Sequence, residues 1–141
     1  MAYAEPVSST ELINNAKEFD TKAIVYEGEA IGDIMIRGEH AWVNLNDGQN
    51  AIGVWLDKSR AVEILYSGSY KFKGDWLEIT GVFHRACLEH GGDLDIHALA
   101  LRKIKPGYAV TQIINWKKIN LVVFLFFILL TLWILRQLKP R

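Results

Sequence analysis

The carboxy-terminal part of the chain contains a run of uncharged, almost wholly apolar residues. Ile119–Leu135 reads INLVVFLFFILLTLWIL, interrupted only by the polar Asn120 and Thr131 and followed by Arg136. The run is apolar on every side instead of along one stripe, which is typical of a membrane-spanning helix. At 1.5 Å per residue it would reach about 25 Å, so the flanking charged and aromatic residues would have to lie at the two interfaces. The sequence therefore predicts a single-pass membrane protein with its helix in the lipid bilayer.

The amino-terminal end gives an expectation for the orientation. The first 20 residues, MAYAEPVSSTELINNAKEFD, have neither a basic start nor an apolar stretch of the kind found in export signals. If the region before Trp116 is not exported, only the six residues after Leu135 have to cross the membrane. We therefore expect the folded domain to be cytoplasmic.

The remaining residues suffice for one modest domain, and their charge is acidic. All 16 acidic residues precede Trp116, together with 11 of the 16 lysines and arginines, so this region carries a net charge of −5. Such a balance disfavours a polyanionic partner. The single cysteine, Cys87, excludes an intramolecular disulfide and agrees with a reducing compartment.

The pattern of the soluble region is mainly that of β-strands. Turn residues Asp47-Gly48-Gln49-Asn50 separate two alternating segments and predict a hairpin, and a second hairpin is expected around Leu88–Leu94. The expected strands are Lys22–Ile36, Ala41–Asn46, Ala51–Leu56, Lys73–Cys87 and Asp95–Ile104, with short helices at Glu11–Phe19 and Asp57–Leu65. Five strands with a helix between the third and fourth predict a five-stranded OB-fold barrel, followed by the transmembrane helix.

Three segments resemble a known family. They read GEAIGDIMIRGEHAWVNLND, YKFKGDWLEITGVF and DIHALALRKI, and together they are similar to small bacterial OB-fold domains of the tRNA-anticodon and nucleic-acid-binding type, in which Gly-Asp opens the fourth strand. The likeness covers Lys22–Lys105 and implies an OB barrel with nucleic acid as one possible partner. The expected organisation is an amino-terminal segment (1–20), the barrel (21–107), a linker (108–118), the transmembrane helix (119–135) and a tail (136–141).

Strand alternation places two tryptophans on one surface. If the first hairpin directs Val43 and Val54 into the core, Trp42 and Trp55 lie opposite each other on the outer face. They would form a stacking platform for bases or for a partner, or else be covered by the amino-terminal helix or the linker. A basic patch that could contact phosphates would contain Lys71, Lys73, Arg102, Lys103 and Lys105.

The second hairpin is rich in possible metal ligands. With Phe83 paired to Leu99, the thiol of Cys87 would face Asp95 and converge with the loop residue His90 and with His97, whereas His84 would point the other way. These four groups, Cys87, His90, Asp95 and His97, could hold a transition metal, and haem is a further possibility. The alternative is a tight Gly91-Gly92 turn in which the aspartates accept backbone hydrogen bonds.

No motif predicts catalysis. The chain lacks a P-loop, a dinucleotide-binding glycine pattern and a G-x-S-x-G sequence. We therefore expect a non-enzymatic binding or assembly module without a cofactor, which self-associates or binds a membrane protein because the tether concentrates it at a surface. Single-stranded nucleic-acid binding is the second hypothesis, and metal or haem handling through the second hairpin is the third.

Overall fold

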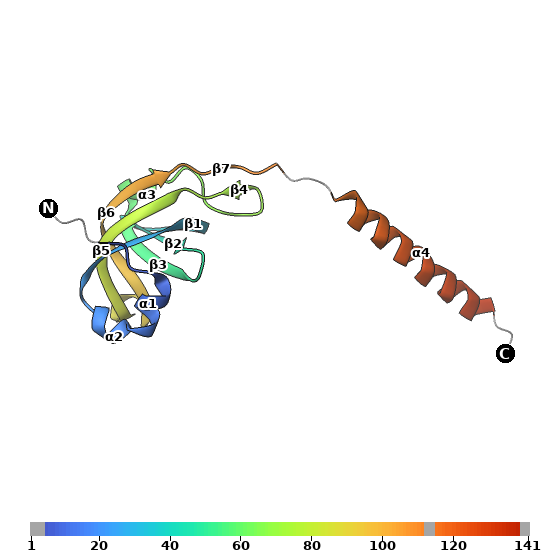
Figure 1. Cartoon of the computed structure of the whole chain (residues 1–141), viewed down its shortest axis with the longest axis horizontal. Helices are drawn as coiled ribbons and strands as arrows, with labels where there is room; N and C mark the ends of the chain where they lie inside the picture. The colour runs from blue at the N-terminus through green and yellow to red at the C-terminus, as the bar shows by residue number, and fades with distance from the viewer. Residues whose placement is uncertain (1–4, 112–114, 139–141) are drawn as a thin grey trace. The chain divides into compact units, whose positions relative to one another are not determined.

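The computed structural model describes residues 5–111 and 115–138. The ends of the predicted amino-terminal segment and tail (1–4 and 139–141) and the middle of the predicted linker (112–114) lie outside the described residues. The chain forms two compact units, residues 1–110 and 111–141. The first contains the β-barrel and the second a single helix (Figure 1).

The first unit is a closed barrel of five strands. The strands are β1 (Ala23–Arg37), β2 (His40–Asn46), β3 (Ala51–Asp57), β5 (Trp76–Cys87) and β6 (Asp93–Lys105). They close in the order β1-β2-β3-β6-β5, and all neighbours are antiparallel except β3 and β6, which are parallel. The short helix α3 (Lys58–Ala61) follows the third barrel strand. This order confirms the predicted OB-like fold.

Alternation along the strands builds the core. In β2 every second residue is buried, and Val43 and Leu45 pair with Val54 and Ile52 of β3 as predicted. Tyr26 and Phe83 are the largest fully buried side chains among the described residues. Because successive strand residues point to opposite faces, this packing directs the intervening residues outward.

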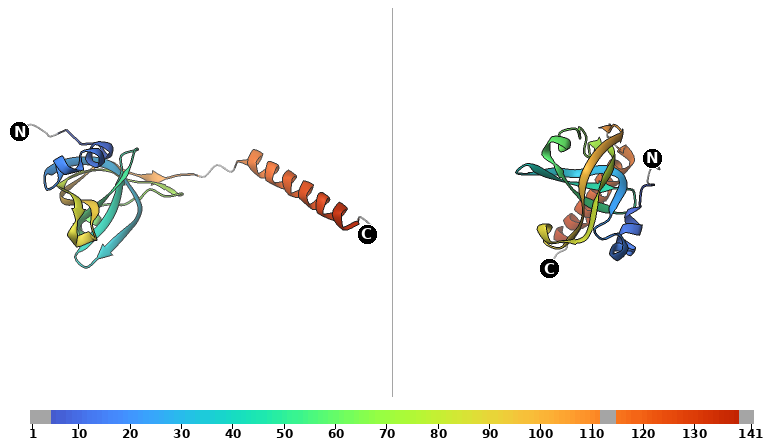
Figure 2. Two further views of the ribbon diagram at one scale, coloured as in Figure 1. Left: turned by 90° about the horizontal axis from the view of Figure 1, so that it is seen from below. Right: turned by 90° about the vertical axis from the view of Figure 1, so that its left-hand side faces the viewer.

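The amino-terminal helix is shorter and more broken than expected. Instead of one helix over Glu11–Phe19, the structure has α1 (Ser9–Asn14) and α2 (Ala16–Phe19), separated at Asn15, whose φ of −111° is not helical. The Ser8 hydroxyl caps α1 by accepting a hydrogen bond from the Glu11 N–H. Leu12 of α1 is fully buried in the barrel core, so these helices cover one end of the barrel (Figure 2).

Residues Gly74-Asp75, which open β5, are fixed by close contacts. A Cβ atom at Gly74 would lie 2.0 Å from the carbonyl oxygen of Ala30, so only glycine fits without moving the backbone. Asp75 is fully buried, and its carboxylate accepts hydrogen bonds from the N–H groups of Gly107 (2.6 Å) and Leu65 (2.8 Å). Lys103 Nζ lies 2.8 Å from the same carboxylate. Asp75 thus ties the segment after α3 and the chain after β6 to the start of β5.

Two small elements complete the unit. β4 (Phe72–Lys73) and β7 (Tyr108–Ala109) form a separate two-stranded sheet, so the predicted strand Lys73–Cys87 is interrupted before Trp76. The 3-10 helix η1 (Leu88–His90) forms the β5–β6 loop together with Gly91 and Gly92. The predicted helix Asp57–Leu65 is reduced to the single turn α3.

The second unit contains α4 (Trp116–Leu138), which extends beyond the predicted 119–135 at both ends. Its 23 residues would span about 35 Å, long enough for a bilayer. The hydroxyl of Thr131 donates to the carbonyl oxygen of Phe127 (2.8 Å), so the polar group in the middle of the apolar run is satisfied within the helix. By length and composition α4 could cross a membrane.

Candidate functional site

Trp42 and Trp55 lie opposite each other on the outer face of β2 and β3, in the predicted register. Their ring centroids are 6.5 Å apart, and both side chains are partly buried. The indole of Trp42 extends across β3, where a Cβ atom at Gly53 would lie 2.0 Å from its ring. Its N–H donates to the side-chain oxygen of Asn44 (3.1 Å). A glycine in β3 and an asparagine in β2 therefore hold Trp42 flat against the barrel.

Two histidines extend this surface, and among the described residues the ring partners of the two tryptophans are these histidines and each other. His40 stacks on Trp55 with a centroid distance of 5.0 Å and an interplanar angle of 11°. His90, from the β5–β6 loop, lies 4.6 Å from Trp55 and 5.1 Å from Trp42. We call Trp42, Trp55, His40 and His90 the aromatic face. The role of His40 was missed from sequence, although its pairing with Asp57 at the start of the same hairpin places it beside the tryptophans.

A pocket adjoins the aromatic face. It has a volume of roughly 440 Å³ and lies between the end of β1, the strand β2 and the β5–β6 loop. Its lining residues are Met35, Arg37, Trp42, Glu89, His90, Gly91 and Asp93. The pocket thus combines an aromatic wall with one arginine and two carboxylates. Its size lies within the range of small-ligand sites.

The four predicted metal ligands are brought together beside the aromatic face. One ligand atom from each of Cys87, His90, Asp95 and His97 lies within 4.8 Å of all the others. His97 Nε2 is 3.4 Å from Cys87 Sγ and 3.3 Å from Asp95 Oδ2, and His90 Nδ1 contacts the same carboxylate oxygen. We call these four residues the ligand cluster. His90 belongs to both the cluster and the aromatic face.

The strand register that led to this cluster differs from the predicted one. Phe83 pairs with Ile96, not Leu99, and His84 pairs with Asp95, while irregularities at Thr80/Gly81 and His84/Cys87 shift the pairing. His97 therefore pairs with Val82, and Cys87 pairs with Asp93 instead of facing Asp95. Because Phe83 is fully buried, His84 points outward, and its ring lies 4.7 Å from that of His97. The expectation that His84 points away from the cluster was wrong.

The electrostatics of the cluster centre on Asp95. This carboxylate is fully buried, and its Oδ1 atom has no hydrogen-bond partner among the described residues. The alternative in which Asp95 accepts backbone hydrogen bonds does not match the structure, since its carboxylate contacts the rings of His90 and His97. Burial raises the pKa of the Cys87 thiol, and the nearby Asp95 carboxylate raises it further.

The predicted basic patch is largely neutralised. Lys73 pairs with Glu29, Lys103 with Asp75, and Arg102 with Glu78 across the β5–β6 ladder. Lys71 and Lys105 are exposed. The patch residues Arg102, Lys103 and Lys105 also lie near the end of β6, whereas the β5–β6 loop precedes its start, a separation of about 30–40 Å along the strand. The structure therefore does not join the basic residues to the aromatic face.

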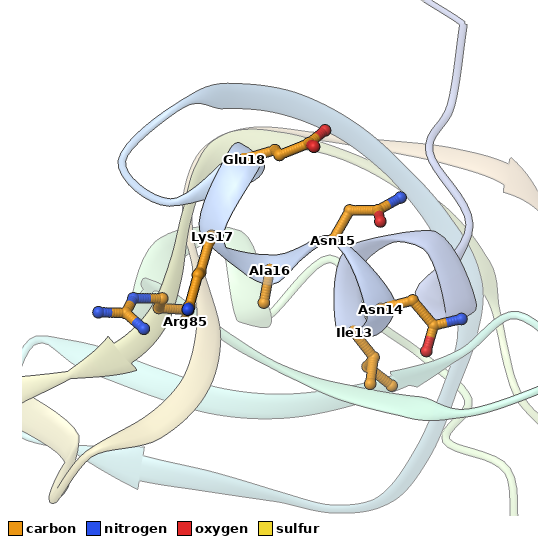
Figure 3. Close-up of a pocket in the computed structure, with 7 residues that line it drawn as sticks. All are labelled: Ile13, Asn14, Asn15, Ala16, Lys17, Glu18 and Arg85. Atoms are coloured by element: carbon orange, nitrogen blue, oxygen red, sulfur yellow. The ribbon is translucent and has the colours of Figure 1, made fainter.

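Two further pockets lie away from the aromatic face. One, of roughly 530 Å³, is lined by Ile13, Asn14, Asn15, Ala16, Lys17, Glu18 and Arg85. Figure 3 shows Glu18 pointing away from Arg85, whose guanidinium instead pairs with Asp20 (3.1 Å). The other, of roughly 270 Å³, is lined by Lys73, Gly74, Trp76, Lys105, Pro106 and Tyr108. Sequence reasoning did not single out Trp76 or Tyr108, and this pocket is a second place where aromatic and basic residues meet.

Comparison with known proteins gives similarity of fold. No protein-family model matches the chain, and no curated protein shows significant similarity. Among solved structures, the chain is similar to asparaginyl-tRNA synthetase from Pyrococcus horikoshii, in a complex with asparaginyl-adenylate, at 17% identity and a TM-score of 0.54 over 79% of the chain. Aspartyl-tRNA synthetase from Entamoeba histolytica matches at 13% identity and a TM-score of 0.52 over 77% of the chain. The chain spans about a quarter of each synthetase, 24% and 23% respectively. These matches support the OB-like fold of the barrel.

Proposed function

We propose that the barrel is a binding domain for single-stranded nucleic acid, held at a membrane by α4. The observation that carries this proposal is the position of Trp42 and Trp55 on β2 and β3, next to the β5–β6 loop. OB folds bind oligonucleotides on the face of their second and third strands and on the loop between their last two strands. The similarity to part of two tRNA synthetases gives further support.

The mode of binding follows from the residues of the aromatic face. Bases stack on tryptophan and histidine rings irrespective of sequence, at about 1–3 kcal/mol per base. The pocket has one positively charged residue in its lining, Arg37, and two negatively charged residues, Glu89 and Asp93. Phosphate groups therefore gain little electrostatic attraction there. We therefore propose a modest affinity that depends on stacking more than on charge, for one or a few nucleotides.

The membrane association and the assembly role are two further proposals, and the structure supports the first better than the second. The length and composition of α4 support a spanning helix, and the cytoplasmic side remains the expectation from sequence. Self-association or a membrane protein partner, the first hypothesis from sequence, draws no support from the structural similarities, whereas nucleic-acid binding does. We therefore place the assembly role second. That the chain is not an enzyme remains a prediction from the sequence.

The test is a titration of the full chain in mild detergent with single-stranded oligonucleotides at several salt concentrations. Tryptophan fluorescence is the readout. We expect saturable quenching and weaker binding of a duplex of the same length, because duplex bases are not free to stack. Each phosphate contact contributes about −0.7 to the slope of log affinity against log salt for single strands, so a shallow slope of about −0.7 to −1.4, for one or two contacts, is expected. A steep slope with equal duplex binding would indicate a basic surface elsewhere. Absence of saturable binding would reject the proposal.

A further inference from the structure

We propose that the ligand cluster of Cys87, His90, Asp95 and His97 is a binding site for one zinc ion. The four side chains come from both strands of the second hairpin and from η1 between them. They offer one thiolate, two imidazoles and one carboxylate, which are the three ligand types that zinc binds. The site is independent of the nucleic-acid proposal, because it rests on the chemistry of the cluster alone.

Two separations within the cluster agree with tetrahedral coordination, whereas His90 Nδ1 is in hydrogen-bond contact with Asp95 Oδ2 and would have to move away from it when a metal binds. With ordinary zinc bonds, two nitrogen or oxygen ligands lie about 3.3 Å apart, and a sulfur and a nitrogen about 3.6 Å apart. The separation between His97 Nε2 and Asp95 Oδ2 is 3.3 Å, and that between His97 Nε2 and Cys87 Sγ is 3.4 Å. The largest separation in the set is below 4.8 Å, so small side-chain rotations would complete the tetrahedron.

The buried carboxylate is a second, independent indication. Asp95 is fully inaccessible, and its Oδ1 has no hydrogen-bond partner among the residues described. A buried carboxylate with an unsatisfied oxygen is costly unless a cation compensates it. The side chains of His90 and His97 are only 10% and 27% exposed, so the ion would be enclosed by protein.

Zinc fits the cluster better than the alternatives. Haem iron takes its protein ligands above and below a ring, whereas these four atoms lie within 4.8 Å of one another. Magnesium and calcium prefer oxygen ligands, and only one of the four groups supplies oxygen. Because four protein ligands fill a tetrahedral shell, the site is closed and structural, not catalytic.

The ion would also shape the aromatic face. His90 is the only residue of the β5–β6 loop in the cluster, and its ring packs 4.6 Å from Trp55 and 5.1 Å from Trp42. Binding zinc would fix η1 against β6 and hold this ring in place. If the nucleic-acid proposal is also correct, removal of zinc should weaken oligonucleotide binding without changing Trp42 or Trp55.

The test uses the untagged full chain in mild detergent, stripped with a chelator and titrated with Zn²⁺ or with Co²⁺ as a spectroscopic probe. We expect one equivalent to bind, Co²⁺ to give tetrahedral d–d bands and a thiolate charge-transfer band, and zinc to raise the unfolding temperature. In Cys87→Ser the thiolate band should vanish. In His90→Ala and Asp95→Asn the affinity should fall by at least about tenfold.

The matched control is His84→Ala, which removes an imidazole beside His97 but outside the ligand cluster. This variant should keep the stoichiometry and both Co²⁺ bands, with at most a small change in affinity. Circular dichroism of each metal-free variant separates loss of the site from loss of the fold. Sub-stoichiometric Co²⁺ without a thiolate band in a folded wild-type chain would show a hydrogen-bonded cluster only and overturn the proposal. A Cys87→Ser spectrum equal to that of the wild type would do the same. Either result would reject the zinc site without rejecting the nucleic-acid proposal, which the oligonucleotide titration tests separately.

Discussion

Replacing Asp75 by alanine is expected to destabilise the barrel by about 3–5 kcal/mol, as for the removal of one partner from a buried ion pair. The substitution removes the acceptor for the N–H groups of Gly107 and Leu65 and leaves Lys103 without its carboxylate. For a domain of this size the unfolding temperature should fall by more than about 10 °C. Thermal and urea unfolding of the full chain in detergent measure the effect.

A matched control is Asp57→Ala. Asp57 pairs with Arg60 at 3.8 Å and lies 3.7 Å from the ring nitrogen of His40, but its side chain is 60% exposed, so the expected loss is below about 1 kcal/mol. A loss at Asp75 as small as that at Asp57 would contradict the role given to the buried network.

The pH dependence of the Asp75 effect has a definite sign. Burial opposes ionisation of this carboxyl group, but hydrogen bonds from Gly107, Lys103, Leu65 and Tyr66 outweigh it and hold the pKa below its ordinary value of 3.8. A carboxyl group whose pKa is lowered on folding contributes stability that is complete above the unfolded pKa and is lost as the pH falls through the folded one. The difference between wild type and Asp75→Ala should therefore be constant near neutral pH and shrink in strong acid.

Substituting alanine for Trp42 or Trp55 is expected to weaken single-stranded oligonucleotide binding about 10- to 100-fold, the equivalent of one stacked base. Both rings are partly exposed on the outer face, so their removal should change binding more than folding. Fluorescence anisotropy of a labelled oligonucleotide provides the readout, because it does not depend on the tryptophans themselves. Circular dichroism confirms that each variant is folded.

Trp76→Ala is the control for these variants. Trp76 is a partly buried outer-face tryptophan of β5, in the pocket that also contains Lys105 and Tyr108. Its removal is expected to leave affinity within about twofold, since it lies outside the aromatic face. If Trp76→Ala weakens binding while the variants at Trp42 and Trp55 do not, the nucleic-acid site has been assigned to the wrong end of the barrel.

Much of the barrel follows from local patterns in the sequence. The pairing of β2 with β3 was predictable because a turn sequence and strict alternation fix the register of a hairpin. The pairing of β5 with β6 was not, because irregularities at Thr80/Gly81 and His84/Cys87 change the register without a clear sequence signal. The ligand cluster still assembles, since η1 carries His90 back over Asp95.

The surfaces were harder to predict than the strands. Proximity of Trp42 and Trp55 follows from alternation, but the packing of His90 against them depends on how the β5–β6 loop folds in three dimensions. The pairing of three residues of the predicted basic patch, Lys73, Arg102 and Lys103, was unforeseen for a similar reason. Glu29 lies on β1, far from Lys73 in the sequence, and Glu78 lies on β5, the strand next to Arg102. Only their positions in the barrel show that they neutralise Lys73 and Arg102.

The most direct measurement of the central claim is photo-cross-linking of the zinc-supplemented full chain to a single-stranded oligonucleotide that contains a photoreactive base, with the attachment sites mapped by mass spectrometry. The account predicts cross-links in the peptides that contain Trp42, Trp55 and the β5–β6 loop, because these groups form the aromatic face. An unlabelled single strand should compete for them, and a duplex should compete poorly. Cross-links concentrated at Trp76, Lys105 and Tyr108, or no cross-linking above that of the duplex, would contradict it.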